Sequence, residues 1–292
     1  MDTFLIATNL FLLLFWVRLW SEPDKELYFN PFLSAPTRFT DRVLGFLRPA
    51  IPLPGRLLAL LLIVFFLTFR AVLANNFMPE EPWTITIGTF FRYAPRTPDV
   101  YGVILFSVLD FLFFIARFWG VYVLVQLLTP IPRRDRAAQT FFYAALPISM
   151  FRRWSQLVLL LAVHAVLAYE ISQAGTPLTA PVAAAVAHPA LPLATAATFN
   201  LIQLGRLALF SVADSLLMAW QLMFALLVTS FAALMLQNPL LTAVSTEGVN
   251  TLLGGTRKRL LIGFLDLTPL LYMGSVYLLY NMVVLPILFA SM

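Results

Sequence analysis

Four charged or titratable side chains lie inside long apolar stretches of the sequence: Asp110, Arg117, His164 and Asp214. A charged group at the centre of a membrane helix costs about 2.5–3.5 kcal/mol on insertion scales, so it needs a partner or a function. Buried ion pairs, proton paths and ion paths are the roles that such residues fill in membrane proteins. These four residues are therefore the candidate site.

Arg117 is the most demanding of the four. At the helical rise it lies about 16 Å from Leu128, where its apolar stretch ends, which is near the middle of a bilayer. Asp110, on nearly the same helix face, and Asp214, in a later apolar stretch, are its candidate acceptors. Three hypotheses stay open: an ion pair that holds two helices together, an ion or proton path, and a contact with a lipid headgroup or a partner subunit.

The remaining intramembrane groups predict structural roles. Arg18 and Arg70 lie near the ends of their stretches, so their side chains are expected to extend to the bilayer surface. His164 is expected to be neutral and hydrogen-bonded to another helix, because the second histidine, His188, lies in a loop. The chain has no cysteine. Without a nucleophile beside a histidine, paired acid and base groups or a phosphate-binding glycine loop, we expect no catalytic residues, no metal, no cofactor and no enzymatic activity.

Composition defines the class of protein. Of 292 residues, 61% are hydrophobic and 11% charged, and the mean hydropathy is +0.87. Soluble domains have about 45–50% apolar and about 25% charged residues. These values exclude a soluble globular domain, a disordered chain and a nucleic-acid-binding domain, and they predict an integral membrane protein.

Six apolar segments are long enough to cross a membrane. They cover residues 4–20, 57–74, a third segment that begins between 100 and 109 and ends at 128, then 155–171, 199–236 and 264–289. The fifth is expected to be one long helix because it has no Gly or Pro between Leu207 and Leu236. The predicted fold is an all-α, polytopic bundle of six transmembrane helices with short cytoplasmic interfacial helices, including one within residues 138–151.

Basic residues predict the orientation of these segments. Alternate loops carry thirteen Lys and Arg residues against two in the other loops, and the basic side is cytoplasmic. Both termini are then outside, on the periplasmic face of a bacterial inner (plasma) membrane. The basic residues expected to face anionic lipid headgroups are Arg38, Arg42, Arg133, Arg134, Arg136, Arg257, Lys258 and Arg259.

One short pattern occurs twice. Asn30-Pro31 follows the first apolar segment and Asn238-Pro239 follows the fifth, and each pair precedes a cytoplasmic segment and another span. Asn-Pro indicates a turn, because proline restricts the residue before it. After the first copy, residues 37–48 form an amphipathic pattern with Arg38 and Arg42 on its polar face, which predicts a helix in the headgroup layer.

These motifs resemble the YggT family, also called YlmG. The first copy carries the resemblance in Tyr28-Phe29-Asn30-Pro31-Phe32, Thr40-Asp41, Leu47-Arg48-Pro49 and Ile51-Pro52, and the second in Asn238-Pro239 and Asp266-Leu267-Thr268-Pro269. Asp266 or Thr268 is expected to cap the last span. The predicted organisation is a first repeat at 1–75, an inserted middle hairpin at 76–198 and a second repeat at 199–292.

A weaker match raises the possibility of a third repeat. Ser107-Val108-Leu109-Asp110 and Ser211-Val212-Ala213-Asp214 occur at comparable places before the third and fifth spans. The middle hairpin would then be a diverged copy, a hypothesis that the sequence leaves open.

The leading functional hypothesis is a non-enzymatic membrane scaffold or assembly factor that works through its basic cytoplasmic helices. The resemblance implies roles in membrane organisation, cofactor assembly of membrane complexes, and osmotic or ion homeostasis. The alternatives are a small ion or solute transporter that uses its intramembrane Asp and Arg residues, and an accessory subunit of a larger complex. The expected partners are the lipid bilayer and a membrane protein or a second copy of the chain, and no nucleic acid.

Overall fold

The computed structural model describes residues 2–21, 31–77, 83–88, 91–97, 99–128, 141–178, 201–253, 261–262 and 265–290. This part of the chain is mostly helical. The helices are α1 (Asp2–Trp20), α3 (Pro31–Leu47), α4 (Gly55–Phe77), α5 (Val100–Leu128), α7 (Leu146–Ser149), α8 (Arg153–Ala174), α10 (Leu201–Leu236), α11 (Pro239–Leu252), α12 (Thr268–Leu278), the π-helix η1 (Leu279–Val284) and α13 (Leu285–Ala290). The strands are β1 (Ile85–Ile87), β2 (Phe91–Pro95), β3 (Gly175–Leu178), β4 (Leu261–Ile262) and β5 (Leu265–Asp266).

Five helical stretches of the described residues are long and apolar enough to cross a membrane: Gly55–Asn76, Val100–Leu127, Arg153–Ala174, Leu204–Leu236 and Thr268–Ile287. Helix α1 contains a shorter apolar stretch, Phe4–Trp20. The chain is thus a helical membrane protein of several spans.

Helix α10 runs without a break for 36 residues, which confirms the single helix predicted from the absence of Gly and Pro. It ends where Gln237 takes a left-handed backbone conformation with a φ of 48°. Asn238 follows, and its side-chain oxygen accepts a hydrogen bond from the Leu241 N–H at 3.4 Å. Pro239 then begins α11, because proline is well suited to the first turn of a helix.

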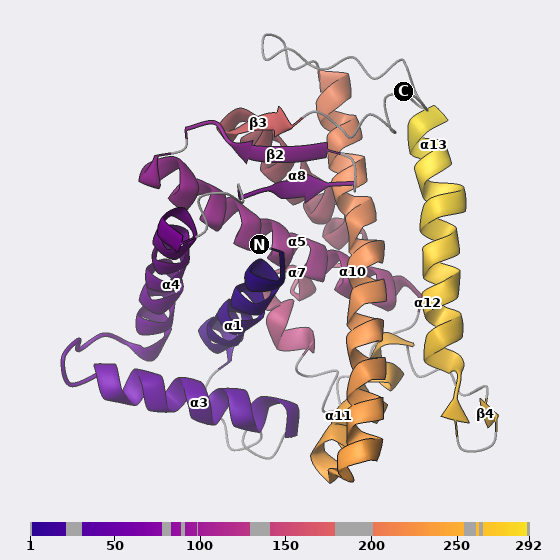
Figure 1. The fold of residues 1–292 in the computed structure, drawn as a ribbon, viewed down its shortest axis with the longest axis horizontal. Helices are drawn as coiled ribbons and strands as arrows, with labels where there is room; N and C mark the ends of the chain where they lie inside the picture. The colour runs from indigo at the N-terminus through magenta and orange to yellow at the C-terminus, as the bar shows by residue number, and fades with distance from the viewer. Residues whose placement is uncertain are drawn as a thin grey trace.

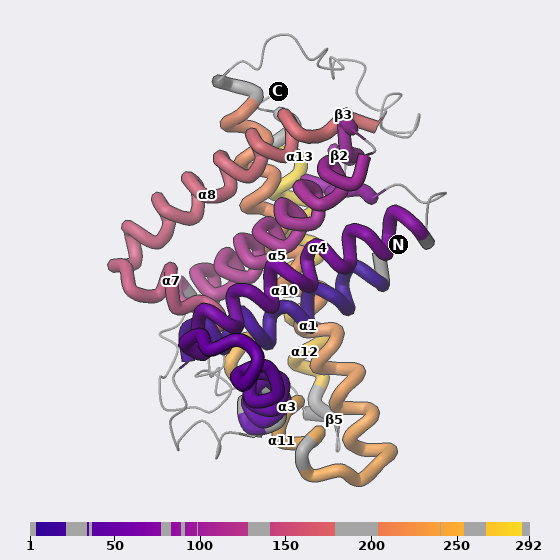
Figure 2. Tube along the Cα trace, turned by 90° about the vertical axis from the view of Figure 1, so that its left-hand side faces the viewer, coloured from indigo at the N-terminus to yellow at the C-terminus, as the bar shows by residue number. Residues whose placement is uncertain are grey.

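The elements separate toward two ends of the molecule (Figures 1 and 2). Helices α3 and α11 and the β4–β5 pair lie at one end, and the sheet of β1, β2 and β3 lies at the other. Helix α5 runs through the middle, where it contacts α4, α8 and α10, while α1 packs on α4. Within an apolar 18-residue stretch of α5, 56% of the residues are buried inside the protein. The corresponding share is 22% in α10 and 22% in Thr268–Ile287.

The two small sheets were not predicted from the sequence. In the larger sheet, β2 pairs antiparallel with β1 and with β3, in registers that include Ile85 opposite Tyr93 and Ala94 opposite Thr176. Ile85 and Ile87 point into the core, which is the alternation of a half-buried strand. Burial raises the pKa of Tyr93 to about 12. The sheet thereby joins the loop after α4 to the end of α8.

Asp99 caps α5 just outside that sheet. Its Oδ1 accepts a hydrogen bond from the Gly102 N–H at 3.1 Å, as an aspartate at a helix start commonly does. The Thr97 side chain and the Gly102 N–H hold the pKa of this exposed carboxyl below its usual value. The third span therefore begins at Val100, the early end of the range expected from the sequence.

The last span contains an irregular turn. Six residues of η1 lie between α12 and α13, and Pro286 is the second residue of α13. Proline has no N–H to donate to the preceding turn, so it favours such a local change of helix type. The turn carries Tyr280, whose side chain is buried.

Candidate functional site

Arg70 is the centre of a buried polar network that joins α1, α4 and α5. Its Nε donates a hydrogen bond to the Ser107 Oγ at 2.8 Å, and its Nη1 donates to the Asn9 Oδ1 at 2.6 Å and to the Thr8 Oγ1 at 3.2 Å. Its Nη2 donates to the Ser107 carbonyl at 2.5 Å and forms an ion pair with the Asp110 Oδ2 at 3.2 Å. The Asn9 Nδ2 also donates to the Asp110 Oδ2, at 3.0 Å.

This network satisfies a guanidinium that is removed from water. Arg70 is 2% exposed, and its guanidinium carbon lies 5.1 Å from the centre of the Trp83 ring. The Ser107 hydroxyl in turn donates to the Leu67 carbonyl at 2.8 Å. A buried charge persists only where its hydrogen bonds and counter-charge are supplied, so the network holds three helices in one arrangement.

The expectation for Arg70 was wrong, whereas the expectation for Arg18 stays a prediction. Arg70 is inside the bundle instead of extending to the surface. Arg18 is 7% exposed, and its Nη2 pairs with the Asp41 Oδ1 on α3 at 2.7 Å. Each side chain has an acceptor on a neighbouring helix: Asp110 on α5 for Arg70 and Asp41 on α3 for Arg18.

A second polar cluster lies where α5, α8 and α10 meet. The His164 Nδ1 and the Ser211 Oγ are 2.5 Å apart, which confirms that the histidine bonds to another helix. The Asp214 Oδ2 accepts a hydrogen bond from the Gly88 N–H at 2.8 Å. Gly88 has a φ of +66°, and a side chain there would collide with Phe210, so the turn after β1 needs glycine to reach α10.

Arg117 joins neither carboxylate directly. Its guanidinium carbon lies 4.9 Å from the centre of the Phe113 ring on the same helix. Among the described residues its Nε has no hydrogen-bond partner, and neither Asp110 nor Asp214 forms an ion pair with it within 4.0 Å. Among the described residues, Arg117 therefore forms neither of the direct ion pairs that the first hypothesis named, and Arg70 pairs with Asp110 instead. Arg117 still attracts both carboxylates at longer range.

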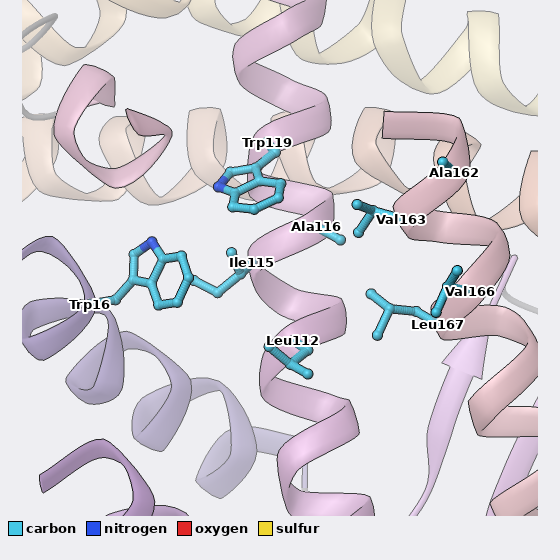
Figure 3. Close-up of a pocket in the computed structure, with 9 residues that line it drawn as sticks. All are labelled: Trp16, Leu112, Ile115, Ala116, Trp119, Ala162, Val163, Val166 and Leu167. Atoms are coloured by element: carbon cyan, nitrogen blue, oxygen red, sulfur yellow. The ribbon is translucent and has the colours of Figure 1, made fainter. Parts of the chain in front are cut away.

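An apolar groove of about 320 Å³ lies between α1, α5 and α8 (Figure 3). Trp16 and Trp119 form one side of it, and α8 forms the other with Val163 and Val166. Both indole N–H groups donate to the Ala144 carbonyl, at 3.0 and 3.3 Å. The groove has no charged lining residue, so its chemistry is that of a surface for apolar chains.

The residues of the first motif gather around α3. Helix α3 begins at Pro31, earlier than the predicted residue 37, and Asn30 lies outside the described residues. Thr40 is buried and its hydroxyl donates to the Thr37 carbonyl at 3.0 Å. The remaining motif residues Arg48 and Pro52 are exposed beyond the end of the helix.

The residues of the second motif begin two helices. Asn238 and Pro239 start α11, and Pro269 is buried in the first turn of α12, as expected. The predicted cap is wrong: the N-cap residue of α12 is Leu267, which makes no side-chain cap, and Asp266 lies in β5. Strand β5 is followed by Leu267 and then directly by α12, with Pro269 in its first turn, so a side-chain cap is not what starts this helix.

Of the basic residues expected to face lipid, Arg38 and Arg42 are exposed on α3. The others, Arg133, Arg134, Arg136, Arg257, Lys258 and Arg259, lie outside the described residues. Within the described ranges, no group of three or more His, Cys, Asp or Glu side chains is arranged to hold a metal ion.

Sequence reasoning missed four members of the Arg70 network: Thr8, Asn9, Ser107 and Trp83. The repeated Ser-x-x-Asp pattern was the signal that could have found one of them, since Ser107 and Ser211 both lie in buried polar clusters with their aspartates. No protein-family model, curated protein or solved structure matches the chain.

Proposed function

We propose that the protein is a non-enzymatic scaffold or assembly factor of the YggT type in a bacterial inner membrane. It would cross the membrane six times, through α1 and the five longer apolar helices, and keep both termini on the periplasmic side. Its working surface is the exposed face of α3 together with the basic residues that the sequence assigns to the other cytoplasmic loops. The organisation into repeats at 1–75 and 199–292 around a middle hairpin at 76–198 belongs to the same proposal.

The observation that carries this proposal is the way α3 is attached to the bundle. The Arg18–Asp41 ion pair and the buried Leu44 hold one face of α3 against the membrane helices. The opposite face leaves Arg38 and Arg42 exposed, and Phe46 is 84% exposed. A rigidly held helix with cationic and aromatic side chains suits anionic headgroups and the surface of a membrane partner.

Two contacts support the proposed orientation. The β1–β3 sheet joins the loop after α4 to the end of α8, two segments that the basic-residue count assigns to the outer side. Helices α3 and α11, which it assigns to the cytoplasmic side, contact each other at the opposite end of the molecule. Segments assigned to the same side are therefore neighbours.

Charge reversal on α3 tests the function. Arg38→Glu with Arg42→Glu should abolish the co-purification of membrane proteins cross-linked to the full chain in native membranes. The matched control is Arg92→Glu with Arg96→Glu, two exposed arginines at the sheet end. Equal recovery of partners from both double variants contradicts a working surface on α3.

The orientation has its own test, because the native chain has no cysteine that reacts. Single cysteines at positions 145, 185 and 250 are exposed to an impermeant thiol reagent added outside intact spheroplasts. The proposal expects labelling at 185 alone. Labelling at 145 or 250, or none at 185, contradicts the six-span orientation.

A transporter remains the second candidate because no direct ion pair among the described residues involves Arg117 or Asp214. Replacing Arg117 with leucine separates the two functions. A scaffold retains its partners, whereas a transporter loses ion flux in proteoliposomes while its oligomeric state is unchanged.

A further inference from the structure

The polar cluster between α5, α8 and α10 contains more hydrogen-bonding atoms than the protein itself satisfies. Within the described residues, four side-chain atoms are buried without a hydrogen-bond partner: the Arg117 Nε, the His164 Nε2, the Asp214 Oδ1 and the Ser215 Oγ. His164 and Ser215 are 0% exposed and Asp214 is 2% exposed. Buried polar atoms are almost always paired with protein or with ordered water, so a group of four in one place points to a ligand.

These atoms belong to one location. Arg117 interacts electrostatically with both His164 and Asp214. One turn beyond Arg117, a side-chain carbon placed on Gly120 would collide with the Ser215 side chain, so α5 and α10 approach closely there. The cluster is therefore enclosed by three helices.

Two further elements close it. Tyr280, in the π-turn of the last span, is buried and lies near Asp214. The Gly88 N–H reaches the same carboxylate from the β1–β3 sheet. The site thus lies between the sheet, the central helices and the irregular part of the last span.

The charges determine which ligand fits. Arg70 and Asp110 neutralise each other, and Arg117 and Asp214 carry one charge each of opposite sign. A bare cation or anion at the cluster would leave a net charge in an apolar interior, which is costly. A small neutral molecule that both donates and accepts hydrogen bonds leaves the balance intact, and water has these properties.

We propose that these groups form an intramembrane water-binding site, in which water links the Arg117 guanidinium to the Asp214 carboxylate. The same water forms hydrogen bonds with the His164 Nε2 and the Ser215 Oγ, as donor or as acceptor. About three hydrogen bonds are usual for a buried water, and the four unpaired atoms supply them. The water completes the packing of α5, α8 and α10.

Radiolytic hydroxyl-radical labelling of the intact protein in detergent tests the site, because radicals formed from bound water modify adjacent side chains. Tyr280 and Tyr122 form a matched pair, since each is 1% exposed. Tyr122 lies elsewhere in the core, where Gln126 donates a hydrogen bond to its hydroxyl. We expect Tyr280 to be labelled at least about five times faster than Tyr122. Equal rates overturn the proposal.

A double variant excludes local opening as the source of that labelling. Replacing both Arg117 and Asp214 with leucine should reduce the labelling of Tyr280 to the rate of Tyr122. Persistent fast labelling in this variant overturns the proposal.

A double-mutant cycle of melting temperatures is the second measurement. Each single leucine variant, at Arg117 or Asp214, leaves one charge unbalanced, whereas the double variant does not. We expect the double variant to lose less than the sum of the two single losses. Additive losses show that no water couples the pair and overturn the proposal.

Discussion

Two hairpins with the same order of helices are held together in different ways. The first consists of α1, α3 and α4 and the second of α10, α11 and α12, and in each a proline begins the connecting helix. The first is joined by charge: Arg18 pairs with Asp41 on α3, and Arg70 binds both Asn9 on α1 and Asp110 on α5. In the second, α11 packs on α10 through the close approach of Gly248 to Leu226.

The exposure of the two hairpins differs accordingly. In the apolar window of α4, 44% of residues are buried, against 22% in α10. Large side chains such as Phe231 and Met235 remain exposed along α10. A buried ionic network fixes geometry, whereas exposed apolar side chains along a membrane helix are available to lipid or to a partner in the membrane. The long helix of the second hairpin is thus more exposed than α4 of the first.

Removing Arg70 should cause the largest loss of stability in the first hairpin. Arg70→Leu leaves the Asp110 carboxylate buried without its counter-charge, and we expect a loss of about 3–5 kcal/mol in the free energy of unfolding. The control is Arg206→Leu, at the corresponding end of α10, where no described residue pairs with the arginine; a change within about 0.5 kcal/mol is expected. Equilibrium unfolding in mixed micelles measures both.

The Arg70 result can be sharpened with a second substitution. Adding Asp110→Leu to Arg70→Leu removes the isolated charge, so part of the lost stability should return. If both single arginine variants lose the same stability, the two hairpins are not held differently.

Much of the fold follows from the pattern of apolar residues. The long α10 was predictable because no Gly or Pro interrupts it, and the start of α11 was predictable from Asn238-Pro239. The short strands were not, because Ile85–Ile87 and Gly175–Leu178 are distant in sequence and too short to show a periodic pattern. The π-turn was not predictable either, because a proline inside an apolar segment does not by itself specify this helix type.

The site was predictable in its members and not in its pairing. Asp110 and Asp214 were recognisable as intramembrane carboxylates, yet Arg70 rather than Arg117 binds Asp110. The spacing along one helix suggested Arg117, but the relative depth and rotation of α4 and α5 decide the pair. Those quantities depend on side-chain packing over the whole interface, which a single sequence does not specify.

The α3 attachment offers a smaller test of the same contrast. Asp41→Asn removes the charge that binds Arg18 at 2.7 Å while it keeps the shape of the side chain. We expect a loss of about 1.5–3 kcal/mol, the usual contribution of a hydrogen bond to a charged group. Thermal unfolding with a probe on α3 measures it.

Glu247 on α11 is the matched position in the second hairpin. Its Oε2 is buried and has no hydrogen-bond partner among the described residues. Glu247→Gln removes a half-buried charge, so the melting temperature should stay the same or rise. A fall as large as that of Asp41→Asn means that α11, too, is held by an ion pair.

The two glycines of the connecting helices give the smallest effect and the sharpest comparison. A side-chain carbon at Gly45 on α3 meets no atom within 4 Å, whereas at Gly248 on α11 it lies 2.6 Å from a methyl group of Leu226. Gly45→Ala should stabilise the protein by about 0.5–1 kcal/mol, because alanine loses less backbone freedom in a helix. Gly248→Ala gains the same propensity and must displace Leu226, so its gain should vanish or reverse. Equal stabilisation by the two substitutions, measured by unfolding in one detergent, contradicts the close approach of α11 to α10 and with it the apolar attachment of the second hairpin.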